Sequence, residues 1–173
     1  MNHLVKLLKA DTVVQGQPVL APIPVRVSVV MVVYQTGPAL QSSLDHVLAE
    51  PLTDEFVIVD NGSPPEDEAL FLSLMARDPR VRLIQGHGNV GFARAANMGA
   101  DAAQGRALVF LNPDAFLQPD CIRQLVLATE GRSSPCIVGA RILNEDGSEQ
   151  RGSRRGEVSP LTTILSFSGL AAK

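Results

Sequence analysis

The chain has few cysteines, little net charge and no long hydrophobic run, and each shortage excludes a class of protein. Its two cysteines, Cys121 and Cys136, form neither a disulfide framework nor a metal-binding motif. The formal net charge of −3 gives no electrostatic argument for nucleic-acid binding. No segment reaches the length of about 18 apolar residues that a membrane span needs. The first residues also lack a signal-peptide pattern, so we expect a reduced, cytoplasmic protein.

The residues that are present predict an α/β fold. Hydrophobic residues make up 45% of the chain and charged residues 19%, which is typical of one globular domain with a substantial core. Apolar, β-branched runs predict strands at residues 25–34, 55–60, 81–84, 106–111 and 136–143. Helical patterns lie between them, beginning near Gly37, Ser63, Gly91 and Pro119. This alternation indicates βαβ units on a mostly parallel sheet with helices on both faces.

Local signals add detail at the ends of these elements. Ser63-Pro64-Pro65-Glu66 matches a capping box with proline at the first helical position. The helix near Gly91 would carry one apolar face, formed by Phe92, Ala95, Ala96, Gly99 and Ala103. We expect three regions: an irregular lead-in over residues 1–24, in which residues 4–9 could form a helical turn; a main domain over residues 25–157; and a tail over residues 158–173. The spacing of apolar residues in the tail favours packing, either on the sheet or on residues outside this sequence, with a membrane-surface helix as the alternative.

Polar residues follow three of the predicted strands. Tyr34 ends the first strand, Asp60 and Asn61 end the second, and Asn112 and Asp114 follow the fourth. Ligands of parallel sheets bind outside the carboxyl ends of the strands, where the strand order reverses. Pro113 stops the fourth strand because proline cannot donate to the sheet. The carboxylate of Asp114 would suit Mg²⁺ or Mn²⁺, and such an ion would hold a diphosphate.

A glycine loop precedes the third predicted helix. Gly86-His87-Gly88-Asn89-Val90-Gly91 matches the dinucleotide fingerprint G-x-G-x-x-G, with Asp114 23 residues further on. The candidate acidic residue follows an Asn-Pro break, and two βα units precede the loop without a role, so dinucleotide binding is the weaker interpretation. In either case, the glycines let the backbone approach a ligand, and the helix start offers amide donors to phosphate or sugar oxygens.

Four motifs resemble those of the family 2 glycosyltransferases, and more narrowly the rhamnosyltransferase-like branch, in which Asn-Pro-Asp replaces Asp-x-Asp. The resemblance covers about residues 27–155. In chain order, the motifs are Val-Ser-Val-Val-Met-Val-Val-Tyr34, Val-Ile-Val-Asp60-Asn-Gly-Ser63, Gly88-Asn-Val-Gly-Phe-Ala-Arg-Ala-Ala-Asn97-Met-Gly99 and Leu-Asn112-Pro-Asp114. Gly139-Ala-Arg-Ile-Leu143 and the following Asp146-Gly-Ser148 are also similar to that branch.

The resemblance implies a GT-A (Rossmann-like) fold whose N-terminal half binds a nucleotide-diphospho-sugar. It implies that Asp60 accepts a hydrogen bond from N3–H of a pyrimidine, with Tyr34 beside the base; an Asx turn is the structural alternative for Asp60. Asn61 belongs to the same implied nucleotide-sugar site. Asn112 would lie near the ribose or diphosphate, and Asp114 would bind the metal. The implied donor pocket is lined by Gly91, Phe92 and Asn97.

The implied activity is inverting transfer of a rhamnose-like sugar from a dTDP- or UDP-sugar to a polysaccharide or lipid-linked acceptor. A lipid-linked acceptor would bring the protein to the inner face of the membrane. The family's general base lies in a later acidic motif that this sequence does not contain, and Glu145 and Asp146 fit a solvated turn better. We therefore expect the chain to be a donor-binding half that transfers little sugar by itself. A non-catalytic nucleotide-sugar-binding module is the second hypothesis, and a dinucleotide-binding protein is the third.

Overall fold

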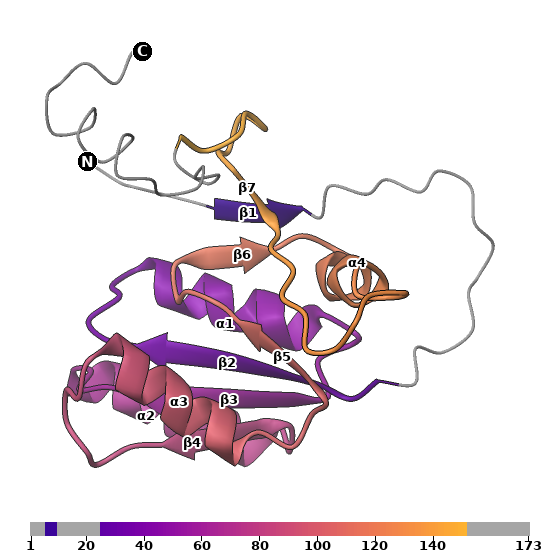
Figure 1. Cartoon of the computed structure of the whole chain (residues 1–173). Helices are drawn as coiled ribbons and strands as arrows, with labels where there is room; N and C mark the ends of the chain where they lie inside the picture. Colours follow the sequence, from indigo (N-terminus) through magenta and orange to yellow (C-terminus); the bar gives the residue numbers. More distant parts are fainter. Residues whose placement is uncertain (1–5, 10–24, 152–173) are drawn as a thin grey trace, which may run out of the picture.

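The computed structural model describes residues 6–9 and 25–151, which form two sheets and four helices (Figure 1). The larger sheet has four strands in the order β4-β3-β2-β5. All of its pairings are parallel. The strands are β2 (Val27–Val33), β3 (Glu55–Asp60), β4 (Val81–Ile84) and β5 (Ala107–Phe110). The helices are α1 (Ala39–Ala49), α2 (Pro65–Arg77), α3 (Phe92–Ala102) and α4 (Cys121–Leu127). The expected α/β fold with a parallel sheet is confirmed.

Hydrophobic packing on both faces buries the two central strands. Every residue of β2 and β3 is buried. One face packs against α1, α2 and α4 through residues such as Leu44, Phe71 and Ile122. The opposite face, which includes Val30 and Val59, packs against α3. Strands that are apolar on both faces are typical of parallel sheets covered by helices on each side.

Close packing fixes α3 on the sheet. Gly99 lies so near the strands that an added Cβ would be 2.4 Å from Cγ1 of Val30 and 3.0 Å from Cγ2 of Val59. Ala95 is fully buried on the same helix. Phe92, expected on this apolar face, is instead 61% exposed at the start of the helix. It therefore does not belong to the core, and it lies at the end of the sheet where the strands point.

The smaller sheet joins segments far apart in the sequence. β1 (Lys6–Lys9) pairs in parallel with β6 (Ala115–Leu117) and antiparallel with β7 (Arg141–Leu143). A helical turn at residues 4–9 was therefore wrong for residues 6–9. The strand expected at residues 136–143 is limited to the three residues of β7, and Cys136 is exposed outside it. The rest of the lead-in and the tail at residues 158–173 lie outside the described residues.

The capping box at Ser63 was also wrong. α2 begins one residue later than that motif requires, with Pro64 at its N-cap and no side-chain cap. The N–H of Ser63, which Glu66 would bond in the expected capping box, donates to Oδ1 of Asp60 instead, and the actual N-cap, Pro64, has no backbone N–H to donate. The N–H groups of Asp67 and Glu68 bond to the carbonyl of Pro64 instead. This shift leaves the hydroxyl of Ser63 without a partner among residues 25–151.

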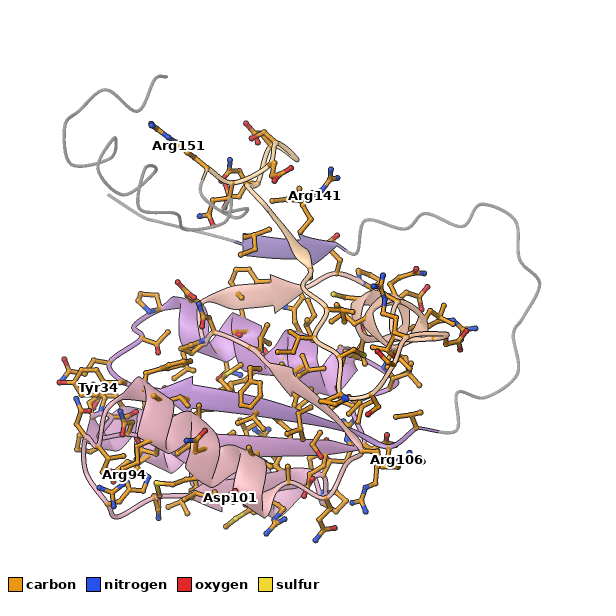
Figure 2. All side chains as sticks on the ribbon, viewed as in Figure 1. Tyr34, Arg94, Asp101, Arg106, Arg141 and Arg151 are labelled. Atoms are coloured by element: carbon orange, nitrogen blue, oxygen red, sulfur yellow. The ribbon has the colours of Figure 1, made fainter. Side chains whose placement is uncertain are left out.

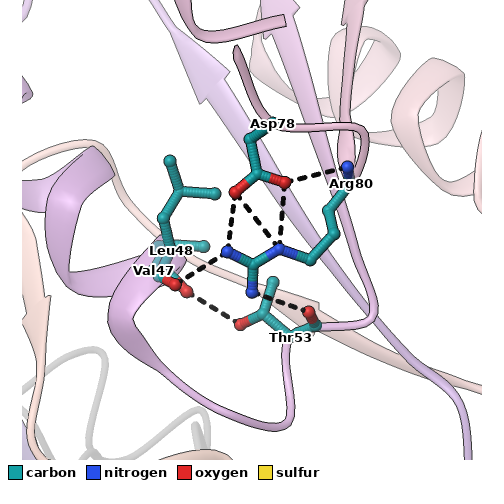
Figure 3. A network of polar contacts seen from close by, with 5 residues as sticks. All are labelled: Val47, Leu48, Thr53, Asp78 and Arg80. Carbon is teal, nitrogen blue, oxygen red and sulfur yellow. Dashed lines mark hydrogen bonds and ion pairs between the residues drawn. The ribbon is translucent and has the colours of Figure 1, made fainter.

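The guanidinium of Arg80 connects the loops at the amino ends of the strands, away from the site described below (Figure 3). Arg80 pairs with Asp78 at 2.7 Å and donates to the carbonyls of Leu48 at 2.9 Å and Thr53 at 3.3 Å. The hydroxyl of Thr53 donates to the carbonyl of Val47 at 2.9 Å. This network joins the turn before β4 to the segment that connects α1 and β3.

Candidate donor-binding site

The carboxyl ends of β2, β3 and β5 meet at one edge of the larger sheet, to the left in Figure 1. Val33 of β2 pairs with Asp60 of β3, and Val30 pairs with Phe110 of β5. The chain runs from β2 outward to β3 and β4, then crosses to β5 on the other side of β2. The strand order therefore reverses between β2 and β5, which is where parallel sheets bind their ligands.

One carboxylate oxygen of Asp60 holds the following turn, and the other has no partner in the described part of the protein. The residue is 4% exposed, and its Oδ1 accepts the backbone N–H groups of Ser63 at 2.8 Å and Gly62 at 3.2 Å. These bonds form the Asx turn that the sequence left as an alternative. Oδ2 makes no hydrogen bond within the part of the chain that the structure describes. Asp60 can therefore hold its own turn and still accept a hydrogen bond from a ligand.

Asn61 positions the glycine loop. It is 3% exposed, its Nδ2 donates to Oδ1 of Asn89 at 3.0 Å, and its Oδ1 accepts the N–H of Val90 at 3.0 Å. Asn89 Oδ1 also accepts the N–H of Gly91 at 2.9 Å. Both side-chain groups of Asn61 are thus used within the protein. Asn89 is part of the predicted glycine loop, yet its role could not be anticipated because its partner lies 28 residues away.

The glycine loop leads into α3 without a side chain that caps the helix. Gly86, Gly88 and Gly91 all have positive φ values, of 88°, 62° and 83°, which residues with a side chain rarely adopt. Gly91 is the N-cap of α3, and no side chain caps the helix. The backbone N–H groups in the first turn of α3 therefore remain available to an anionic ligand. Asn97 is exposed further along this helix.

Two groups missed by the sequence reasoning lie near this loop. Arg94, an exposed residue in the first turn of α3, lies at the same end of the molecule as Tyr34, and Arg106 lies at the other end (Figure 2). His87 directs Nδ1 to the carbonyl of Gly88 at 2.7 Å, while its Nε2 is buried without a partner among the described residues. Arg94 stands in the predicted motif, so its charge was readable from the sequence; the burial of the Nε2 atom of His87 was not.

The Asn-Pro-Asp segment forms a turn between the two sheets. The N–H of Leu111 bonds to the carbonyl of Val30 at 3.0 Å, and the N–H of Ala115 bonds to the carbonyl of Asn112 at 3.1 Å. Asn112 is exposed and Asp114 is half-buried. The carboxylate of Asp114 makes no ion pair or hydrogen bond within residues 25–151. It is therefore available to a ligand.

The carboxylate of Asp114 suits a metal ion that is held partly by the protein and partly by a bound substrate. In residues 6–9 and 25–151 there is no group of three or more His, Cys, Asp or Glu side chains that could hold an ion by themselves. Mg²⁺ is commonly bound by one or two carboxylates together with substrate phosphates and water. Asp114 alone at this turn matches that arrangement and does not match an all-protein metal cage.

An open groove of about 640 Å³ lies between the loops that follow β2 and β3. It is lined by Gln35, Gly37, Pro38, Gly62, Ser63, Pro64, Glu66 and Asp67. Burial and the nearby charges of Glu66 and Asp60 raise the pKa of Asp67. Tyr34 precedes this loop and is 47% exposed. The sequence predicted Tyr34 and Asp60 at this end but not the acidic wall that Glu66 and Asp67 add.

Comparison with known families identifies this arrangement. The model of the family described as glycosyl transferase family 2 matches residues 28–169, which is most of the chain. The chain belongs to this family. Glycosyltransferase GlyG of Streptococcus pneumoniae is 27% identical over 114 residues, covering 65% of this chain and 38% of GlyG. The succinoglycan biosynthesis protein ExoO of Rhizobium meliloti is 30% identical over 145 residues, covering 82% of this chain and 41% of ExoO. This family 2 chain thus spans about two fifths of these relatives.

Solved structures share the fold. A mannosyltransferase, PcManGT of Pyrobaculum calidifontis in complex with GDP-Man and Mn²⁺, has a TM-score of 0.58 at 22% identity, over 68% of this chain and 37% of PcManGT. Residues 1–349 of S. aureus TarS give a TM-score of 0.53 at 15% identity, over 64% of this chain and 38% of that one. The fold is therefore that of the GT-A glycosyltransferases, as expected. No helix in the described part of this family 2 chain is long and apolar enough to cross a membrane.

Proposed function

We propose that this chain binds the nucleotide-diphospho-sugar donor of an inverting glycosyltransferase. The observation that carries the proposal is the position of Asp60, the glycine loop and the Asn-Pro-Asp turn. Asp60 ends β3, the glycine loop follows β4 and the Asn-Pro-Asp turn follows β5. All three therefore lie at the carboxyl ends of the parallel strands, in a family 2 chain whose strand order reverses between β2 and β5. The donor would be a dTDP- or UDP-sugar, with a rhamnose-like sugar as the transferred group. The acceptor would be a growing polysaccharide or a lipid-linked glycan.

The nucleoside would bind at the ends of β2 and β3. Oδ2 of Asp60 would accept a hydrogen bond from N3–H of the pyrimidine, while Oδ1 keeps the turn in place. The exposed ring of Tyr34 would lie beside the base. Asn61 would act indirectly, since its side chain holds the glycine loop against the end of β3.

The diphosphate and sugar would lie between the glycine loop and the Asn-Pro-Asp turn. Backbone N–H groups in the first turn of α3, after Gly91, would face phosphate or sugar oxygens, and Arg94 would add positive charge at this end. Phe92 and Asn97 would line the sugar pocket, and Asn112 would contact the ribose or diphosphate. Asp114 would hold Mg²⁺ or Mn²⁺, which when bound neutralises charge on the departing nucleoside diphosphate.

Transfer with inversion also needs a base that takes the proton of the acceptor hydroxyl. None of the residues placed at the edge of the sheet has that role in this proposal. The donor site is therefore the part of the reaction that this chain can be tested for. A lipid-linked acceptor would bring a cytoplasmic protein to the inner face of the membrane. A nucleotide-sugar-binding module without transfer activity would have the same donor site.

A calorimetric titration of the 173-residue chain tests the proposal. We expect UDP or dTDP to bind in the presence of Mn²⁺ and to bind much more weakly in EDTA. NAD serves as the competing ligand because Gly86–Gly91 matches its fingerprint. Binding of NAD in preference to both nucleoside diphosphates would contradict the proposed donor site.

A further inference from the structure

The Asn-Pro-Asp turn is anchored at both of its ends. Before the turn, the backbone N–H of Leu111 donates to the carbonyl of Val30 in β2 at 3.0 Å. After it, the carbonyl of Ala115 accepts a hydrogen bond from the hydroxyl of Ser43 in α1 at 2.7 Å. Asp114 lies between these two anchors, directly before Ala115. The backbone that carries its carboxylate is therefore tied to β2 on one side and to α1 on the other.

Ser43 is a polar residue on the buried face of α1. It is fully buried and shares that face with Leu40, Leu44 and Val47. Alanine would suit the position better by itself, because serine has a lower helix propensity and a hydroxyl that must be paired when buried. A serine within a helix usually faces solvent or bonds the carbonyl four residues earlier. Here the hydroxyl donates to a residue 72 positions later, and this bond accounts for a serine in the core.

The carbonyl of Ala115 depends on this hydroxyl. Ala115 is buried and begins β6, whose three residues are all buried beside α1 (Figure 1). The N–H of Ala115 closes the turn by donating to the carbonyl of Asn112 at 3.1 Å. Without the hydroxyl of Ser43, the carbonyl would lose a partner in a buried environment, which is unfavourable for an acceptor. We expect the backbone next to Asp114 to move until the carbonyl is paired again.

Both anchors belong to the unit formed by β2 and α1, which also reaches the groove. Tyr34 follows β2 directly, and Gly37 and Pro38, just before α1, line the groove. Core packing of residues such as Leu44 fixes α1 on the sheet. The position of Asp114 relative to the groove is therefore set through α1 as well as through the order of the strands.

We propose that Ser43 is a positioning residue for the metal site: by holding the carbonyl of Ala115, it keeps the carboxylate of Asp114 where it can share an ion with a diphosphate. The inference rests on the proposed function, and it adds a residue that contacts neither the nucleotide nor the ion. Mg²⁺ and Mn²⁺ prefer octahedral sets of oxygen ligands, so a site of this kind tolerates little displacement of a ligand. Asp114 is the one protein ligand of the proposed site, so no second carboxylate compensates for a shift.

Calorimetry on the 173-residue chain tests the role of Ser43. The measured quantity is the Mn²⁺ factor, by which we mean the UDP affinity with Mn²⁺ divided by the UDP affinity in EDTA. Ser43→Ala should lower the Mn²⁺ factor about tenfold, the smaller end of the loss seen when groups that orient metal ligands are removed, and leave the affinity in EDTA unchanged. Ser43→Cys, which is close in size and has a weaker donor, should lower it less. In the Asp114→Ala chain, Ser43→Ala should change UDP binding no further, because the serine acts through that carboxylate.

Two control variants separate positioning from a general loss of stability. Ser42→Ala removes an exposed hydroxyl from the adjacent position of α1 and should leave the Mn²⁺ factor unchanged. Thr53→Val removes a buried hydroxyl that donates to the carbonyl of Val47, near the end of α1 that lies away from the groove. Urea unfolding should show that Ser43→Ala and Thr53→Val both lower stability, whereas only Ser43→Ala should lower the Mn²⁺ factor.

The outcomes distinguish this inference from the proposed function. If Mn²⁺ does not strengthen UDP binding in the parent chain, the proposed metal at Asp114 is wrong, and the role of Ser43 with it. If the Mn²⁺ factor of the parent persists in both Ser43 variants, the donor site stands and the positioning role is wrong. An equal loss of UDP affinity with Mn²⁺ and in EDTA, or an equal loss of the Mn²⁺ factor in Thr53→Val, would also overturn the positioning role. If Ser43→Ala does not fold, Ser43→Cys decides the matter by the same comparison.

Discussion

The side-chain amide of Asn61 donates to the side-chain carbonyl of Asn89 at 3.0 Å, joining the end of β3 to the glycine loop before α3. Asn89 in turn accepts the N–H of Gly91, the N-cap of that helix. The two asparagines thus connect the position proposed for the nucleoside with the amides proposed for the diphosphate. Because Asn61 is buried, water cannot replace these bonds without a change in the loop.

Asn61→Ala should therefore loosen the glycine loop. We expect unfolding free energy to fall by about 1–3 kcal/mol, because the N–H of Val90 and the side chain of Asn89 lose their partner. Hydrogen exchange at Val90 and Gly91 should accelerate, and nucleoside diphosphate affinity should fall. Gln85→Ala, at an exposed position just before the loop, is the control. Unchanged exchange at Val90 would contradict the positioning role.

The strands could be predicted because their signal is local. β3 and β4 begin and end as expected from their apolar residues; β3 is buried throughout, whereas β4, at the edge of the sheet, buries only Val81. β1 could not be predicted in this way, because Lys6–Lys9 forms a strand only through pairing with β6 and β7, more than 100 residues later. Its pattern alone allowed a helical turn.

The candidate site was predictable to the same extent. The carboxyl ends of strands mark where ligands bind, so Asp60 and Asn112 could be placed at one edge of the sheet. What each side chain does there depends on partners remote in sequence, as Asn61 and Asn89 show. The unpaired state of the Ser63 hydroxyl could be seen only in the structure, because α2 begins one residue after the expected cap.

Glu55 should make stability depend on acid pH. Burial raises its pKa, but hydrogen bonds from the N–H of Gln104, the hydroxyl of Ser28 and the guanidinium of Arg82 lower it, and the net effect is a lowered pKa. The stabilisation is therefore present above the pKa of the unfolded state and is lost as pH falls through the folded-state pKa.

Glu55→Gln should lower the free energy of unfolding at pH 7 by about 1–3 kcal/mol, since the amide replaces a buried acceptor of three hydrogen bonds. Urea unfolding from pH 7 downward measures the difference, which should shrink in acid. Glu68→Gln, at an exposed position of α2, is the control. A difference independent of pH would rule out the carboxylate charge as its cause.

Glu50 should show the opposite dependence. It is 4% exposed, and burial and the charge of Asp120 raise its pKa. A raised folded-state pKa means that the folded chain binds the proton more tightly, so stability is highest below the unfolded pKa and falls as pH rises through the folded value. Glu50→Gln should be more stable than the parent at pH 7 and similar to it near pH 4. Urea unfolding at both pH values provides the measurement; lower stability of the variant at pH 7 would contradict it.

Asp60→Asn tests the proposed contact with the base. The amide keeps an oxygen for the Gly62 and Ser63 N–H groups, so the turn should persist. We expect UDP and dTDP to lose about 1–3 kcal/mol of binding free energy, because a charged acceptor is replaced by a neutral amide. Calorimetry with ADP, whose adenine has no ring N–H to donate at that edge, separates the roles, since an equal loss for ADP and UDP would indicate a structural effect.

Asp114→Ala tests the metal. The residue follows β5 in a turn whose hydrogen bonds are made by the backbone of Asn112 and Ala115, so removal of the carboxylate should leave the fold intact. We expect Mn²⁺ to improve UDP binding in the parent chain but not in the variant, while the affinity measured in EDTA stays similar in both. Asp101→Ala, at an exposed position of α3 away from the Asn-Pro-Asp turn, controls for loss of surface charge. Because uridine lacks the diphosphate on which the metal would act, uridine should bind both chains alike, with or without Mn²⁺. An Asp114→Ala chain whose UDP affinity still rises with Mn²⁺ as in the parent would place the metal on other residues.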